Sequence, residues 1–87
     1  MKIKQGYILS EIAGSYHVVA VGKAVKEFKG IINLNKTGAF LFEKLIKGAT
    51  EEELTAFLTA EFEVDEQTAK NDVKKFTKGL MEANLVD

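Results

Sequence analysis

The hydrophobic pattern of this chain changes its period near residue 35. Glycines recur every eight residues, at positions 6, 14, 22, 30 and 38, and short apolar runs lie between them up to residue 34. Turn residues at such an interval are typical of short strands. Beyond it, apolar residues recur at helical spacing, and the chain contains no proline to interrupt a helix. Strands followed by helices predict an α+β domain.

Three strands are expected, over residues 7–12, 16–21 and 30–34, because these runs are rich in β-branched and aromatic side chains. Gly14-Ser15 fits a type II′ hairpin turn between the first two. A lysine-rich connector, residues 23–29, leads to the third strand. A meander of three strands places that short third strand at an edge of the sheet.

Three helices are expected after the sheet. Asn35 is the predicted N-cap of the first, which ends at Gly48. Thr50 and Glu53 form a capping box for the second, and Asp65 caps the third. The expected fold is therefore winged helix-turn-helix-like, with a three-stranded antiparallel N-terminal sheet followed by three helices in a single domain, residues 1–87. Phe40, Phe57, Phe62 and Phe76 are predicted to belong mainly to one core between the sheet and the helices.

Composition argues against catalysis and against nucleic-acid binding. The chain has no cysteine and one histidine, His17, so it offers neither a thiolate site nor a pair of histidines, and we expect no enzyme activity, cofactor or metal. All 12 basic residues are lysines, and the net charge is −1, whereas DNA readers usually carry a basic surplus and use arginine. No signal peptide or membrane span is evident, so a reducing cytoplasm is the expected location.

Two features remain after the core is assigned. The first is the edge strand, residues 30–34, which can recruit a partner strand. The second is one shoulder of the last helix, where a helical wheel gathers Lys70, Lys74, Thr77 and Met81 beside the buried stripe Ala69, Val73, Phe76 and Leu80. A solvated lysine face is the simpler explanation of that shoulder.

Several segments resemble the PqqD-like family in the same order along the chain. They are Gly30-Ile31-Ile32-Asn33-Leu34-Asn35-Lys36-Thr37-Gly38-Ala39-Phe40-Leu41-Phe42, then residues 48–54, Val64-Asp65, and residues 72–76. The resemblance extends from about Gly6 to Val86. Members of that family are small proteins or fused domains known as RiPP recognition elements, which bind the leader segment of ribosomally made, post-translationally modified peptides.

The resemblance implies that a precursor leader peptide adds as a strand beside the third strand and rests on the last helix. The domain would then present the peptide to a modifying enzyme such as a radical SAM protein. The implied peptide-binding residues are Gly30, Ile31, Ile32, Asn33, Leu34, Lys70, Val73, Lys74, Thr77 and Met81. Members serving pyrroloquinoline quinone synthesis typically carry Cys-Asp-Gly where this chain has Ile46-Lys47-Gly48, which favours another modified peptide.

Other functions remain open at this stage. A winged-helix DNA-binding regulator would use the lysine-bearing face of the last helix, with Lys70, Asn71, Lys74, Lys75 and Lys78. Its affinity would fall steeply with salt, whereas strand pairing in an apolar groove would not. A purely structural interaction module would lack the leader partner. The exposed edge is compatible with a monomer or with a strand-paired dimer.

Overall fold

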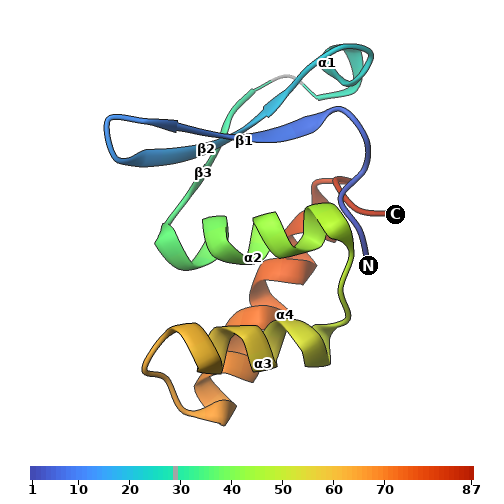
Figure 1. Ribbon diagram of the computed structural model, residues 1–87. Coiled ribbons are helices and arrows are strands. Elements are labelled where there is room, and N and C mark those ends of the chain that lie inside the picture. The colour runs from blue at the N-terminus through green and yellow to red at the C-terminus, as the bar shows by residue number, and fades with distance from the viewer. Residues whose placement is uncertain (29) are drawn as a thin grey trace.

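A sheet and a helical layer make up the protein (Figure 1). The computed structural model describes residues 1–28 and 30–87. The elements are, in order, β1 (Tyr7–Ile12), β2 (Ser15–Ala20), α1 (Ala24–Glu27), β3 (Ile32–Leu34), α2 (Lys36–Lys47), α3 (Glu51–Glu61) and α4 (Glu66–Glu82). The predicted α+β fold is confirmed, with α2, α3 and α4 on one side of the sheet. The one-turn helix α1 in the lysine-rich connector was not predicted.

The sheet is antiparallel with strand order β1-β2-β3, so β3 lies at an edge as expected. Tyr7 pairs with Ala20 and Val18 pairs with Ile32. The third strand is shorter than predicted, because Gly30 and Ile31 precede it. Gly30 has a φ of 142°, which is outside the extended conformation that a strand requires.

The turn between β1 and β2 differs from the predicted type II′. Its central residues are Ala13, with a φ of 51°, and Gly14, with a φ of 81°. Positive φ at both positions defines a type I′ geometry, which matches the twist of the two strands. The sequence prediction placed the turn one residue too late, because Ser15 already belongs to β2 and pairs with Ile12.

The predicted helix starts are confirmed. The side chain of Asn35 accepts a hydrogen bond from the amide of Gly38 at 2.7 Å. Thr50 and Glu53 exchange two hydrogen bonds of 3.0 Å in a complete capping box. Asp65 stands at the N-cap of α4, but its side chain makes no capping hydrogen bond. The polar side chain of Thr68 lowers the pKa of the Asp65 carboxyl group.

The phenylalanine at the centre of the core is Phe42, which is fully buried and was not among the four predicted core phenylalanines. Phe40, Phe62 and Phe76 pack at the margin of the core, and Phe57 is 38% exposed. The reason is that α2 carries apolar side chains from Ala39 to Phe42 without a polar break, so spacing alone does not show which of them faces inward. The predicted stripe of α4 is confirmed at Ala69, Val73 and Leu80, which are all buried.

Phe40, Phe57 and Phe62 form a peripheral cluster that joins α2 to α3. The rings of Phe40 and Phe62 pack edge to face, with centroids 5.3 Å apart. The ammonium group of Lys44 lies 5.2 Å from the ring centre of Phe40 and 4.9 Å from that of Phe57. At these distances the cation is attracted by both rings. This cluster fixes how α3 lies on α2.

The two ends of the chain close the fold together at the end of α2. Ile3 forms an isolated antiparallel bridge with Val86, and the amide of Lys4 donates to the carbonyl of Leu85 at 2.8 Å. The amide of Ile3 donates to Leu45 of α2 at 2.9 Å. No helix in the described part of the chain has the length and apolar character needed to cross a membrane.

Candidate functional site

The free edge of β3 is the first component of the site. Within residues 1–28 and 30–87, β2 is the one strand that pairs with β3, and no strand pairs with its other edge. Ile32 and Leu34 are half-buried and pack against the core, whereas Asn33 is exposed on the outer face. The backbone groups of an unpaired edge are available to a further strand.

His17 contacts β3 on the outer face of the sheet. Its Nδ1 lies 2.6 Å from Oδ1 of Asn33, the residue opposite it in the register. Among the described residues no group of three histidine, cysteine, aspartate or glutamate side chains is placed to hold a metal ion. The pair is therefore a cross-strand contact on the outer face of the sheet.

Beside β3, a small hollow lies between the start of α2 and the middle of α4. It measures about 210 Å³, and its lining residues are Asn35, Thr37, Gly38, Leu41, Asp72, Lys75 and Phe76. A Cβ atom at Gly38 would lie 3.4 Å from the ring of Phe76 and 3.5 Å from Cβ of Leu34. Gly38 is thus the point where β3, α2 and α4 come closest. We call this the helix hollow.

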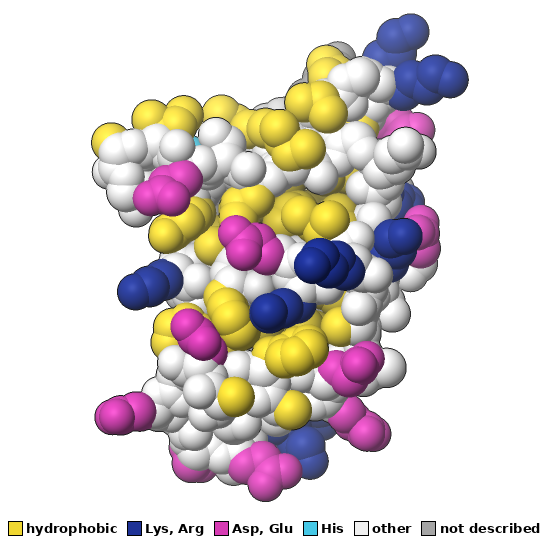
Figure 2. Space-filling view, in the orientation of Figure 1, with side chains coloured by type: hydrophobic (Ala, Val, Ile, Leu, Met, Phe, Trp, Pro, Cys, Tyr) yellow, Lys and Arg dark blue, Asp and Glu magenta, His cyan; other side chains and the backbone are white. Residues whose placement is uncertain are grey.

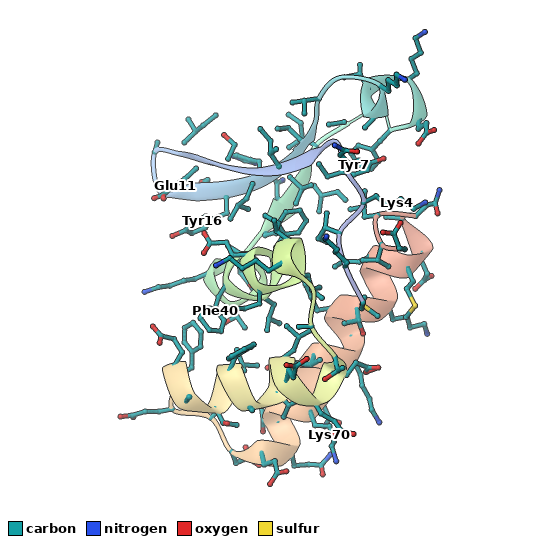
Figure 3. The ribbon with its side chains drawn as sticks, turned by 45° about the vertical axis from the view of Figure 1, so that its right-hand side comes forward. Lys4, Tyr7, Glu11, Tyr16, Phe40 and Lys70 are labelled. Atoms are coloured by element: carbon teal, nitrogen blue, oxygen red, sulfur yellow. The ribbon has the colours of Figure 1, made fainter. Side chains whose placement is uncertain are left out.

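A second, more polar hollow follows the same strand towards the hairpin. It measures about 510 Å³ and is lined by Glu11, Gly14, Ser15, Tyr16, His17, Asn33, Leu34, Asn35 and Lys36. Asn35 belongs to both hollows, so the two adjoin at the end of β3. Glu11 and Tyr16 lie on the hairpin above the start of α2 (Figure 3). We call this the hairpin hollow.

The structure does not place the predicted shoulder of α4 in either hollow. Val73 is 0% exposed and Thr77 is 1% exposed, so both belong to the core. Lys70 and Lys74 line a different hollow of about 500 Å³, between α3 and α4. Figure 3 shows Lys70 at the end of the molecule opposite the sheet. Met81 is 52% exposed, but it lines none of these three hollows.

The other shoulder of α4 is the one that shares a hollow with α2. Asp72, Lys75, Phe76 and Gly79 lie on one side of that helix by their spacing. A side chain at Gly79 would meet no atom within 4 Å, so that position is open. An amphipathic helix has two shoulders, and the wheel alone does not say which one faces the sheet. In the sequence, the aromatic residue Phe76 was the one indication of which shoulder faces the sheet.

The arrangement of charge gives no support to the DNA-binding alternative. Lys70 and Lys74 share their hollow with Glu51, Glu52 and Glu66. Residues 37–87, which contain the three long helices except for Lys36 at the start of α2, carry six lysines and eleven acidic residues. A surface that binds phosphate backbones needs the opposite balance.

The fold and the open strand edge define a small winged-helix-like α+β domain whose β3 is free to accept another strand. Residues 18–86 match the profile of the family described as coenzyme PQQ synthesis protein D. The chain belongs to this family, PqqD, which confirms the resemblance seen in the sequence.

Two solved structures share this fold. The structure described as TbiB1 in complex with the TbiA(beta) leader peptide has a TM-score of 0.78 and 22% identity, over 100% of this chain and 95% of that one. Lasso peptide synthetase B1 complexed with the leader peptide has a TM-score of 0.74 and 20% identity, over 97% and 93%. The comparison with curated proteins gave no match.

Proposed function

We propose that this protein binds the leader segment of a ribosomally made precursor peptide at the free edge of β3 and presents it to a modifying enzyme. The observation that carries this proposal is the unpaired edge of β3 in the described structure, which adjoins two hollows. Membership of the PqqD family and the leader peptides in two structures of the same fold support it.

Strand addition explains how affinity is obtained. A peptide that pairs with Ile32, Asn33 and Leu34 satisfies backbone groups of the edge whatever its own side chains are. Three residues of strand provide few such bonds. The peptide must therefore gain further affinity from the hollows at the end of β3.

The helix hollow is proposed to supply selectivity. Alternate side chains of an added strand point towards the helical layer, as those of Ile32 and Leu34 do. Such a side chain would meet the apolar surface of Phe76 and Leu41, with Asp72 and Lys75 at the margin. Lys75 and Lys36 replace Lys70 and Lys74 in our proposal as the cations that favour an acidic leader, although exposed pairs contribute only about 0–1 kcal/mol each.

The protein is proposed to act by binding and not by catalysis, with the chemistry carried out by a partner such as a radical SAM enzyme. The sequence has no cysteine and one histidine, which leaves no nucleophile–base pair to propose. We propose a cytoplasmic location, in keeping with the lack of cysteine. The single domain, residues 1–87, is proposed to fold and bind as one unit.

The test is calorimetric titration, at 50 and 500 mM salt, with the synthetic leader of a precursor peptide sought among the neighbouring genes. We expect saturable one-to-one binding that changes little with salt. The same titration with a duplex DNA should show no binding. Binding of DNA that falls steeply with salt, with no response to the leader, would replace this proposal by the regulator hypothesis.

A second copy of the chain is a competing occupant of the edge. Sedimentation at increasing protein concentration, with and without leader, separates the cases. A strand-paired dimer that uses β3 should dissociate when leader is added, because both need the same backbone groups.

A further inference from the structure

The outer face of the sheet, away from the helices, carries a group of exposed apolar side chains beside the polar Ser10, Ser15, His17 and Asn33. Among the large hydrophobic side chains that are exposed in the described structure, five belong to the strands or to the segment that joins β2 to β3. They are Ile8 at 45%, Ile12 at 64%, Val21 at 42%, Val25 at 51% and Ile31 at 64%. Figure 2 shows hydrophobic side chains along this upper edge of the molecule. A solvated sheet face is ordinarily polar, so a group of exposed apolar side chains on it is typical of an interaction surface.

A row of β-branched residues crosses this face from β1 to the open edge. Ile8 pairs with Val19, and both point outward because Leu9 and Val18 point to the core. Ile31 directly precedes the paired part of β3, which begins at Val18↔Ile32, and its side chain is 64% exposed at the end of this row. The next position in this row belongs to any strand that adds to β3.

The charge of the sheet half specifies the partner further. Residues 1–36 carry six lysines and two acidic residues, in contrast to the acidic remainder of the chain. Lys23 and Lys26 are exposed around Val25 in the α1 segment, where dark blue side chains project from the apolar edge in Figure 2. A protein surface that is apolar with acidic residues at its rim is complementary to this face.

We infer that the outer face of the sheet and the outward side chains of the bound leader together form one docking surface for the modifying enzyme. This inference rests on the proposed function, because the leader supplies the last position of the row. The enzyme would then bind the loaded protein more tightly than the free one. By linkage, the enzyme must raise the affinity for the leader by the same factor.

A lipid surface is the other occupant that an apolar and basic face could take. Lipid-binding clusters carry about four to eight cations beside the membrane. Among the described residues of the α1 segment, Lys23 and Lys26 are the two lysines beside the exposed apolar side chains, and the row from Ile8 to Ile31 is β-branched, which suits a protein surface better.

The test uses the full chain, the synthetic leader that binds it in the first titration, and the purified modifying enzyme sought among the neighbouring genes. Enzyme binding is measured by interferometry with and without saturating leader, for the parent, Ile8→Glu, Val25→Glu and the control Ile46→Glu. Ile46 lies on α2, and its side chain is 42% exposed, a fraction similar to the 45% of Ile8. We expect the leader to tighten enzyme binding at least about fivefold. Ile8→Glu and Val25→Glu should each weaken enzyme binding at least about tenfold, while Ile46→Glu should leave enzyme binding unchanged. The affinity for the leader in the absence of enzyme should be the same in all four proteins.

The following outcomes would overturn the inference or the proposed function. The inference is overturned if the leader does not change enzyme binding, or if Ile46→Glu weakens enzyme binding as much as Ile8→Glu does. Either result leaves the proposed function intact. Vesicles containing 30% anionic lipid that bind the parent but not Ile8→Glu would also overturn it. A leader that fails to bind in the first titration refutes the proposed function itself. Val25→Glu lies outside the sheet, so it keeps the test decisive if Ile8→Glu does not fold.

Discussion

At the scale of single residues, Phe42 lies at the centre of the core, although the sequence pattern pointed to other phenylalanines. Phe42 is fully buried, whereas Phe57 is 38% exposed beside the ammonium group of Lys44. Deletion of a buried aromatic ring leaves a cavity, which is the larger part of the cost of such a substitution.

Phe42→Ala should therefore lower the free energy of unfolding by about 3–5 kcal/mol. Phe57→Ala should lower it by about 1 kcal/mol, since it loses partial burial and one cation–π contact. Urea denaturation followed by circular dichroism measures both. Equal losses for the two variants would mean that the core is not centred on Phe42.

Substitutions at two residues can show which shoulder of α4 contacts the leader. Phe76 lines the helix hollow beside β3, whereas Met81 is exposed on the other shoulder. Phe76→Ala should weaken leader binding by about tenfold, and Met81→Ala should leave it unchanged. Calorimetry gives the affinities, and a thermal melt shows that Phe76→Ala is folded at the temperature used. A loss confined to Met81→Ala would restore the shoulder first predicted from the sequence.

At the scale of secondary structure, the entry into β1 depends on Gly6. Its φ is 101°, and a Cβ atom there would come within 2.8 Å of Cβ of Ala24 in α1. Gly14 in the hairpin also has a positive φ, of 81°, but a Cβ atom there would meet nothing within 4 Å. The two glycines separate the cost of backbone strain from the cost of a close contact.

Gly14→Ala should lower stability by about 1 kcal/mol through strain alone. Gly6→Ala should cost more than Gly14→Ala, because α1 must move as well. Thermal unfolding of the two variants in the same buffer provides the comparison. If Gly6→Ala proves no more harmful than Gly14→Ala, then α1 is not fixed against the start of β1.

Local signals explain why most elements were predictable. Asn35 and the Thr50–Glu53 capping box mark the starts of α2 and α3 in the sequence and in the structure. The end of β3 towards Gly30 was not predictable, because the backbone angle of that glycine breaks the strand while its neighbours remain β-formers. The side of α4 that faces β3 depends on how α2 and α4 cross, which no local pattern encodes.

At the scale of the whole molecule, both ends of the chain meet the core at α2. Leu85 is fully buried, and the neighbouring bridge joins Val86 to Ile3. The sheet and the helical layer are therefore held together by residues from opposite ends of the sequence. Stability should depend on them as strongly as on the helices.

Leu85→Ala should lower the free energy of unfolding by about 2–5 kcal/mol, much of what a domain of this size has. Ile46→Ala, on the exposed surface of α2, should change it by less than about 1 kcal/mol. Chemical denaturation of both variants tests this. A tolerant Leu85→Ala would show that the C-terminal segment is not required to close the fold.

The central claim is that a leader peptide pairs with the free edge of β3 and fills the helix hollow. Amide NMR of the labelled protein, titrated with the synthetic leader, tests it directly. The shifts should concentrate in residues 32–38 and at Asp72, Lys75 and Phe76, and edge amides of β3 should exchange more slowly with solvent in the complex. Shifts confined to Lys70, Lys74 and the start of α3, with β3 unchanged, would contradict the account.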